Sequence, residues 1–284
     1  MILETGKNAY LCRMGKYTDG MLRRATRLLG EETMGMIAHK SVILFGVGGV
    51  GSWCAEALVR SGILRLTIVD CDRVCVTNIN RQLLATSSTV GEVKVEAMRR
   101  RLLDINPEAE ITAIDRAFTE ETAGTFGLET YDYIIDCIDS LKDKVLLIKM
   151  ATDTDATFFS SMGAALKLDP SRIRTADFWK VRGCPLGAAL RKRIKQSGIT
   201  LRRHFTCVYS EELVDNRGAS APDGSMPCGT ELCSCRQQHD DDSPVKKKRV
   251  NGSLVHITAI FGMMIAGLVI QDCAKDSNAP APES

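Results

Sequence analysis

The stretch SVILFGVGGVG, residues 41–51, decides the fold. Its first five residues are a short apolar run, which is typical of a strand buried in a parallel sheet. The glycines that follow fit the pattern G-x-G-x-x-G from Gly46 to Gly51, and residues 51–60 continue as a helix. In this order of strand, glycine loop and helix, the backbone can approach a phosphate, and the helix N-terminus supplies N–H donors and positive potential. The stretch therefore predicts nucleotide binding.

The residues around this stretch alternate between helix and strand signals. Residues 21–39 have helical spacing, Gly62 ends the helix that starts at Gly51, and residues 64–69 form a second apolar run closed by Asp70. This βαβ unit is complete within about 30 residues. A basic amphipathic helix and two further strands are expected at residues 94–105, 110–113 and 133–137. Strands that alternate with helices predict an α/β fold, a Rossmann-like, doubly wound and mostly parallel sheet with helices before it.

The pattern changes after residue 157, where the chain is expected to extend the same sheet. Further elements are predicted as strands at 157–162, 172–178 and 205–209, a turn at 183–187 and a basic helix at 188–196. Residues 216–249 are rich in Gly, Ser, Pro, Asp and Lys, so a long mobile loop is expected there. The prediction is one domain over residues 20–272, with an N-terminal segment 1–19 and a disordered tail 273–284.

The composition is that of an ordinary globular enzyme. The 284 residues are 44% hydrophobic and 25% charged, which suffices for a full core. Because 37 Lys and Arg face 35 Asp and Glu, the formal charge is only +2, and attraction to nucleic acid must come from local clusters. Eleven cysteines would suit a short secreted protein with a signal peptide, but the first residues have no uninterrupted apolar core. Reduced thiols in the cytoplasm are therefore expected.

The most apolar segment is residues 254–270. It includes His256 and Thr258, and its 17 residues fall short of the roughly 20 apolar residues of a membrane-spanning helix. A buried core element is expected here, and no membrane span.

Polar residues after the second strand separate two classes of nucleotide enzyme. Asp70 follows that strand, where a carboxylate can accept hydrogen bonds from ribose hydroxyls, and an NAD-dependent enzyme would share this feature. The ordered set that distinguishes them is Asp70, Asp72, Asn78, Asn80, Arg81, Gln82 and Lys94. Hydride transfer needs no second cation near the phosphates, whereas attack on the α-phosphate of ATP builds charge that Arg and Lys offset. The set predicts ATP chemistry, although each cation alone would be an ordinary surface charge.

These motifs resemble a known family. The glycine loop, Asp70-x-Asp72, Asn78-x-Asn80-Arg81-Gln82, Lys94 and Asp136-x-x-Asp139 together resemble the ubiquitin-activating-enzyme-like adenylyltransferases of the ThiF and MoeB type. Within that superfamily, the sequence resembles the tRNA threonylcarbamoyladenosine dehydratases in four runs. These are DCIDS at 136–140, SMGA at 161–164, LDP at 168–170 and CPL at 184–186. The resemblance covers most of the chain, from residue 20 to residue 270.

The resemblance implies a reaction and its partners. Members of the family use ATP to dehydrate threonylcarbamoyladenosine beside the tRNA anticodon. Adenylation activates the threonyl carboxylate, so that a neighbouring nitrogen or oxygen closes a ring and expels AMP. The implied cofactors are ATP and Mg²⁺. The implied partners are this tRNA and a second copy of the chain in a homodimer, and a sulfur-transfer protein is left open.

The resemblance also implies the site residues. The nucleotide-binding set comprises Gly46, Gly48, Gly49, Gly51, Asp70, Asp72, Asn78, Arg81, Lys94 and Asp139. In this set the glycines would cradle the phosphates, and Asp70 would hold the ribose. Asn78, Arg81 and Lys94 would orient and neutralise the triphosphate.

Three further residues receive roles from the same resemblance. Asp139 would position Mg²⁺, for which one carboxylate is enough because phosphates and water supply the other ligands. Arg24 matches an arginine that reaches the nucleotide of the partner subunit, so Arg24 joins Arg81, Lys94 and Asp139 as a catalytic candidate. Asp136 is equally compatible with capping the turn that follows it and with a direct role.

The cysteines bear on the alternative function, activation of the C-terminus of a ubiquitin-like sulfur carrier. Enzymes of that class commonly carry two CxxC pairs for structural zinc, and this sequence has no CxxC. Cys228, Cys233 and Cys235, with His239 nearby, have a spacing unlike common zinc sites, which favours free thiols. A third interpretation is an ATP-binding scaffold without chemistry, which the retained Arg81, Lys94 and Asp139 argue against.

Basic clusters are candidate contacts for the tRNA backbone. They are Arg191, Lys192, Arg193 and Lys195 on one helix, then Arg202 and Arg203, and finally residues 246–249. Such runs are equally typical of a solvated face, and Phe205 and Tyr209 are the aromatics that we expect near them. The expectation of RNA contact therefore comes mainly from the resemblance.

Overall fold

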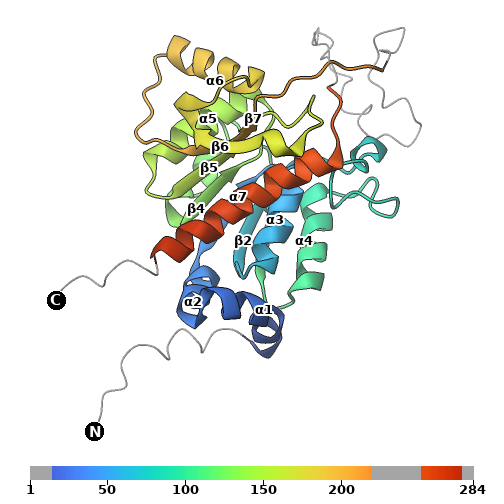
Figure 1. Ribbon diagram of the computed structural model, residues 1–284. Coiled ribbons are helices and arrows are strands. Elements are labelled where there is room, and N and C mark those ends of the chain that lie inside the picture. The colour runs from blue at the N-terminus through green and yellow to red at the C-terminus, as the bar shows by residue number, and fades with distance from the viewer. Residues whose placement is uncertain (1–14, 219–250, 277–284) are drawn as a thin grey trace, which may run out of the picture.

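The computed structural model describes residues 15–218 and 251–276, which are arranged around one central sheet (Figure 1). Its strand order is β3-β2-β1-β4-β5-β7-β6. The strands are β1 (Ser41–Phe45), β2 (Arg65–Val69), β3 (Glu110–Ile114), β4 (Tyr133–Asp136), β5 (Thr157–Ser161), β6 (Ile173–Asp177) and β7 (Thr206–Ser210). Every neighbouring pair is parallel except β6 and β7 at the edge. The prediction of a mostly parallel sheet with a C-terminal extension is confirmed.

Helices cover both faces of this sheet (Figure 1). They are α1 (Lys16–Leu29), α2 (Glu31–His39), α3 (Gly51–Arg60), α4 (Lys94–Ile105), α5 (Leu141–Asp153), α6 (Pro185–Gln196) and α7 (Val255–Asp276). Helices α3, α4 and α7 pack on one face, and α5 and α6 pack on the other. Strand β1 serves both cores, because Val42 and Leu44 point to the first and Ile43 and Phe45 to the second.

Several element boundaries differ from the prediction. Residues 21–39, which have helical spacing, belong to two helices, because the chain breaks at Gly30, whose φ of 84° is a left-handed value that glycine adopts without strain. Helix α6 begins at Pro185, earlier than predicted, because proline suits the first turn of a helix. Helix α5 was not predicted. The predicted loop 216–249 lies largely outside the described residues.

Helix α7 crosses the face of the sheet beside α3 (Figure 1). The two helices approach closely at Gly262, where a Cβ atom would overlap the carbonyl oxygen of Val50. By length and composition alone α7 passes for a membrane span, as core helices of soluble proteins also do, and 44% of its most apolar window is buried. Ile257, Phe261, Ile265 and Val269 of α7 are fully buried in the core, so the predicted buried core element is confirmed. It continues to Asp276, so the tail does not begin at residue 273, where Cys273 is fully buried.

Candidate nucleotide site at the carboxyl edge of the sheet

The glycine loop lies where the carboxyl ends of β1, β2 and β4 meet. The amide of Gly46 donates to the carbonyl oxygen of Val69, which ends β2, over 2.7 Å. The amide of Cys137, which follows β4, donates to the carbonyl oxygen of Phe45 over 2.8 Å. Loops after three neighbouring strands therefore share one edge, the usual place for ligands in open α/β sheets.

The four glycines of the loop fall into two classes. A Cβ atom on Gly46 would lie 2.8 Å from the carbonyl oxygen of Cys137, and one on Gly51 would overlap the carbonyl oxygen of Gly46. A Cβ atom on Gly48 would meet nothing closer than the side-chain nitrogen of Gln82, at 3.8 Å. The space at Gly49 is intermediate, because a Cβ atom there would lie 3.3 Å from the methyl group of Thr258 in α7. Gly46 and Gly51 thus shape the loop, while Gly48 leaves its backbone open to a ligand.

This difference makes a prediction for two alanine variants. Gly51→Ala should lower the free energy of unfolding by about 1–3 kcal/mol, because the new methyl group displaces the loop backbone. Gly48→Ala should change it by less than about 0.5 kcal/mol, yet weaken ATP binding about tenfold or more by filling the space above the loop. Thermal unfolding and ATP titration measure the two effects. Equal stability of the two variants, or unchanged ATP affinity in Gly48→Ala, would contradict the assignment.

Asp70, at the end of β2, organises the loop and the start of α4. Its two carboxylate oxygens accept hydrogen bonds from the amides of Val47, at 2.8 Å, and Asp72, at 2.9 Å. Lys94, the buried first residue of α4, places its Nζ 2.6 Å from Asp72 and 3.8 Å from Asp70. Burial raises the pKa of Asp70 above its usual value, and the charge of Lys94 partly opposes this rise. The structure therefore brings Asp70, Asp72 and Lys94 together with the loop.

The segment after Asp72 brings Arg81 to the glycine loop. It forms a single 3₁₀ turn (Val76–Asn78), in which Oδ1 of Asn78 accepts a hydrogen bond from the amide of Cys75 over 3.0 Å. The guanidinium of Arg81 donates to the carbonyl oxygen of Thr77 over 2.8 Å. The aliphatic stem of Arg81 lies 3.4 Å from the Cβ position of Gly49. Arg81 thus stands beside the loop, and Asn78 shapes the turn that carries it.

Asp136, at the end of β4, is buried and shapes the turn that follows. One of its oxygens accepts the amide hydrogen of Ile138, and the other accepts from Ser160 and forms an ion pair with Lys144, both over 2.7 Å. Lys144 is fully buried and also donates to the carbonyl oxygen of Ile138 over 3.0 Å. The Ile138 peptide is therefore held on both sides. This geometry supports the capping interpretation of Asp136.

Asp139 follows directly on this clamped peptide. Its side chain is exposed, and within residues 15–218 and 251–276 it has no hydrogen-bonding or ionic partner. An exposed, unpaired carboxylate near the glycine loop fits Mg²⁺, which prefers carboxylate and phosphate oxygens. Burial and the charge of Asp136 raise the pKa of the neighbouring Cys137 to about 12, so its thiol is protonated and not a nucleophile.

Arg24 is the predicted site residue that the chain does not bring to this edge. Helix α1 packs at the opposite end of the sheet, where the hydroxyl of Thr18 donates to Asn106 over 3.1 Å. Asn106 follows α4, a helix of 12 residues that starts at the site with Lys94 and runs for about 18 Å. Arg24 is exposed on α1 and so lies far from the glycine loop of its own chain.

The cysteine candidates add no residue to the site among the described residues. Cys184 is buried, in agreement with its omission from the catalytic set, and Cys228, Cys233, Cys235 and His239 lie outside the described residues. In the part of the chain that the structure describes, no group of three His, Cys, Asp or Glu could hold a metal ion.

A cavity of about 300 Å³ lies at the amino edge of the sheet, away from the loop. Its lining includes four acidic residues, Glu129, Asp132, Asp155 and Asp272, against a single lysine, Lys40. Because this lining would repel a triphosphate, we do not assign the nucleotide to it.

Two residues beside the loop received no predicted role, although Gln82 belongs to the ordered set that indicated ATP chemistry. The side chain of Gln82 is buried, and its Oε1 atom has no hydrogen-bonding partner among the described residues. Its amide nitrogen is the group nearest to the open face of Gly48. A buried amide without a hydrogen-bonding partner lowers the stability of the fold by about 1–3 kcal/mol. Because either the oxygen or the nitrogen of the amide can face a ligand, a nucleotide bound over Gly48 could supply the missing partner. The other residue, Thr258, comes from α7 and covers Gly49.

Comparison with known proteins agrees with this geometry. The ThiF family model matches residues 22–282. The tRNA threonylcarbamoyladenosine dehydratase of Bacillus subtilis is 35% identical over 249 residues, which cover 87% of this chain and 92% of that protein. The Escherichia coli dehydratase is 38% identical over 191 residues, 66% of this chain and 71% of that protein.

The fold leads to the same proteins. A crystal structure of the E. coli dehydratase in complex with AMP superposes with a TM-score of 0.77 at 30% identity, covering 93% of this chain and 97% of that one. Another structure of the E. coli enzyme, in complex with ATP, has a TM-score of 0.75. The chain therefore belongs to the ThiF family and, within it, to the tRNA threonylcarbamoyladenosine dehydratases, as its sequence predicted.

Proposed function

We propose that this protein uses ATP to dehydrate threonylcarbamoyladenosine in tRNA. The observation that carries the proposal is the convergence of open Gly48, the unsatisfied amide of Gln82, Lys94 and unpaired Asp139 at one edge of the sheet. The identity of the substrate is inferred from family membership, because the relatives that match most of this chain are named for this reaction.

The reaction consists of two displacements. An oxygen of the threonyl carboxylate attacks the α-phosphorus of ATP, the bond to the β-phosphate oxygen breaks, and pyrophosphate leaves. A nitrogen or oxygen of the same side chain then attacks the activated carbonyl carbon, and AMP leaves as the ring closes. The oxygen lost by the substrate departs with AMP, so the modified nucleoside loses one water.

The residues of this chain have matching roles in the first displacement. The open backbone at Gly48 and Gly49 would cradle the phosphates, and Asp70 would hold the ribose while it keeps Val47 in place. Arg81 and Lys94 would neutralise the charge that grows on the α-phosphate, for which Lys94 must exchange Asp72 for a phosphate. When bound, Mg²⁺ would supply further positive charge to the phosphate oxygens, and Asp139 would hold it.

The test is ATP-dependent mass change of the nucleoside. The protein is incubated with Mg²⁺, ATP and tRNA that carries threonylcarbamoyladenosine, and the digested nucleosides are weighed by mass spectrometry. Loss of one water that requires ATP is the expected result. No mass change, together with pyrophosphate exchange that appears only when a carrier with a C-terminal Gly-Gly is added, would assign the protein to carrier activation instead.

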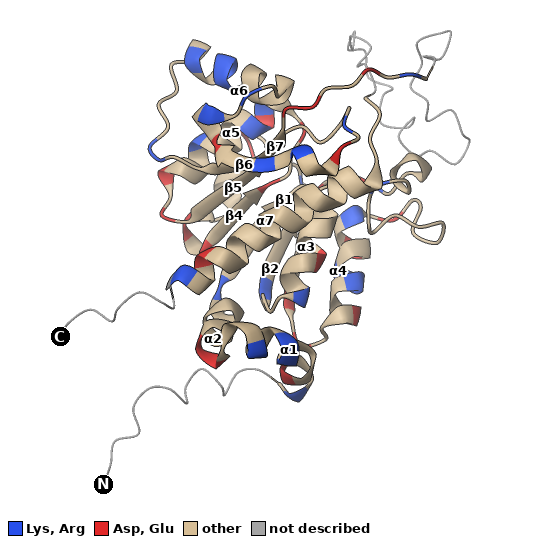
Figure 2. Cartoon of the chain, in the orientation of Figure 1, with Lys and Arg blue, Asp and Glu red and all other residues tan. Residues whose placement is uncertain are grey.

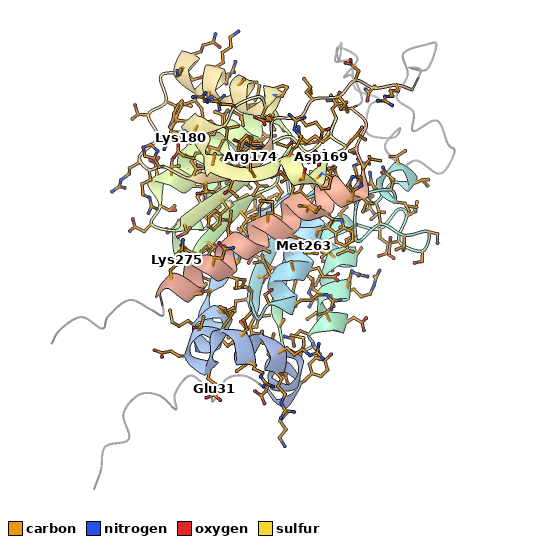
Figure 3. The ribbon with its side chains drawn as sticks, viewed as in Figure 1. Glu31, Asp169, Arg174, Lys180, Met263 and Lys275 are labelled. Atoms are coloured by element: carbon orange, nitrogen blue, oxygen red, sulfur yellow. The ribbon has the colours of Figure 1, made fainter. Side chains whose placement is uncertain are left out.

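We further propose that the enzyme is a cytoplasmic homodimer in which Arg24 completes the partner's site. Two observations support the dimer. Arg24 is remote from its own glycine loop, and α7 turns an apolar side with Met263, which is 44% exposed, outward (Figure 3). Involvement of a sulfur-transfer protein stays a prediction.

A mixing experiment tests the role of Arg24. Arg24→Ala and Asp139→Ala should each be nearly inactive alone. Exchange of subunits at equal amounts should restore about a quarter of the wild-type rate, because half of the dimers are mixed and each mixed dimer has one intact site. Activity is measured after subunit exchange. The same mixture made without exchange is the control, and absence of any recovery would mean that Arg24 does not act across the dimer.

A further inference from the structure

The segment around α6 concentrates positive charge. Residues 178–203 contain no Asp or Glu, and their eight basic residues are Lys180, Arg182, Arg191, Lys192, Arg193, Lys195, Arg202 and Arg203. Because the whole chain has a formal charge of only +2, the rest of it is net negative. Figure 2 shows this basic surface on α6 and the turns beside it. The positive charge is thus concentrated in one part of the fold as well as in one stretch of the sequence.

This charge is not neutralised within the protein. In the described residues, none of the eight side chains forms an ion pair with a carboxylate. Helix α4 is a useful contrast, because Arg100 pairs with Glu92 at 2.7 Å and Arg101 with Glu56 at 2.6 Å. The basic surface of α6 therefore keeps its full attraction for an anion, whereas that of α4 does not.

Helix α6 presents its basic side chains outward. It buries Leu190 and Ile194 against the core, and Lys192, Arg193 and Lys195 are exposed. This orientation follows from the helical spacing, which places the apolar residues on one side.

An aromatic side chain lies within this basic surface. Trp179, on the 3₁₀ turn Phe178–Lys180, is 38% exposed, and Nζ of Lys195 lies 5.8 Å from the centre of its ring. The aromatics expected near the cluster from sequence, Phe205 and Tyr209, are instead buried. An exposed indole beside unpaired cations suits an unpaired nucleobase, which stacks on an aromatic ring while the cations bind its phosphates.

Helix α6 begins near the nucleotide site. Leu186, in the first turn of α6, lies 3.6 Å from the Cβ position of Gly163, which follows the carboxyl end of β5. The neighbouring strand β4 ends at Asp136, which is bonded to Ser160 of β5 over 2.7 Å. The start of α6 therefore lies at the edge of the nucleotide site, whereas Lys192, Arg193 and Lys195 lie about 10–15 Å farther along the helix. Trp179 follows β6 beside the first residues of β7. An RNA arm that reaches the site would extend over this distance along α6.

We propose that Trp179, Lys180, Lys192, Arg193 and Lys195, here called the α6 face, bind the anticodon arm of the substrate tRNA. The lysines and the arginine contact phosphates, and Trp179 stacks on an unpaired base of the loop. The identity of the RNA rests on the proposed function, whereas the preference of this surface for a single-stranded polyanion with bases rests on its charge and on the exposed indole.

The test measures tRNA binding without ATP, as a dissociation constant over a series of KCl concentrations. The face variant is Lys192→Glu/Arg193→Glu/Lys195→Glu. The matched control is Arg27→Glu/Arg65→Glu/Lys275→Glu, which makes the same charge change on exposed residues. Of these, Lys275 lies in the last turn of α7, away from α6 (Figure 3). Each variant is also checked for thermal unfolding and ATP binding, which should match the wild type.

The face variant should weaken tRNA binding by about 10²-fold or more and lower the slope of log affinity against log salt by about 2 to 3. The control should stay within a few-fold of the wild type. Trp179→Ala should weaken binding roughly 5- to 150-fold, and Trp179→Phe should retain most of it, because stacking contributes about 1–3 kcal/mol per base.

The outcomes of this test distinguish a failure of the α6 face from a failure of the proposed function. Wild-type tRNA affinity in the face variant, or an equal loss in the control, overturns the α6 face even if the enzyme dehydrates its substrate. If the wild type binds tRNA through the α6 face but changes no nucleoside mass, the proposed function fails and the surface stands. If the wild type binds no tRNA, the α6 face is overturned.

Discussion

Asp139→Asn should lower the rate of ATP-dependent dehydration by about 10²- to 10³-fold and leave the protein as stable as the wild type. The amide keeps the size of the side chain but removes the charge that would hold a cation at the phosphates. Because Asp139 is exposed and has no partner in the described residues, its replacement should change the free energy of unfolding by less than about 0.5 kcal/mol. Single-turnover rates at several Mg²⁺ concentrations and thermal unfolding measure both effects.

The control for this variant is Asp104→Asn. Asp104 is also exposed, but it lies in the last turn of α4, at the end remote from Lys94. It should keep the wild-type rate. A wild-type rate in Asp139→Asn, or a loss of stability that accounts for its lost activity, would remove Asp139 from the site. By the same reasoning, Arg81→Ala and Lys94→Ala should each cost on the order of 10²-fold in rate.

Lys144→Met should lower the free energy of unfolding by about 3–5 kcal/mol. The side chains of Lys144 and Asp136 are fully buried, and their charged atoms are 2.7 Å apart. Methionine has a similar length, but it leaves the carboxylate of Asp136 buried without a counter-ion. An uncompensated buried charge is the main source of the lost stability when one partner of a buried ion pair is removed. Unfolding in urea, followed at fixed pH, measures the loss.

Two further variants isolate the buried charge as the cause. Lys142→Met, on the same helix, removes a lysine whose ion pair with Glu120 spans 3.6 Å on the surface, and it should cost less than about 1 kcal/mol. Asp136→Asn/Lys144→Met should recover most of the stability that Lys144→Met loses, because neither charge is then buried alone. If the double variant is no more stable than the single one, packing and not charge explains the effect.

The buried pair also explains why α5 could not be predicted from the sequence. Its core side carries Lys144 together with Val145 and Ile148, and a lysine at a core position disguises the apolar spacing of a helix. The partner, Asp136, precedes the helix and becomes visible only in the fold. By contrast, the strand, glycine loop and α3 were predicted correctly, because Gly46 and Gly51 meet local steric demands that sequence spacing reveals.

The residues of the candidate site likewise fall into those that the sequence predicts and those that only the fold reveals. Asp70, Arg81 and Lys94 follow one another along the chain in a recognisable order, so the sequence predicts them as site residues, and the fold places them at one edge of the sheet. The unsatisfied amide of Gln82 and the exposure of Trp179 depend on burial, which spacing alone does not determine.

The closing of α7 over the glycine loop has a consequence for biosynthesis. The loop is translated early, but Thr258, which covers Gly49 and lies 3.5 Å from the carbonyl oxygen of Arg81, follows Arg81 by 177 residues. At about 5–20 residues per second, the ribosome needs roughly 10–35 s to make this segment. A nascent chain that has not yet reached α7 therefore carries the glycine loop without the helix that covers Gly49.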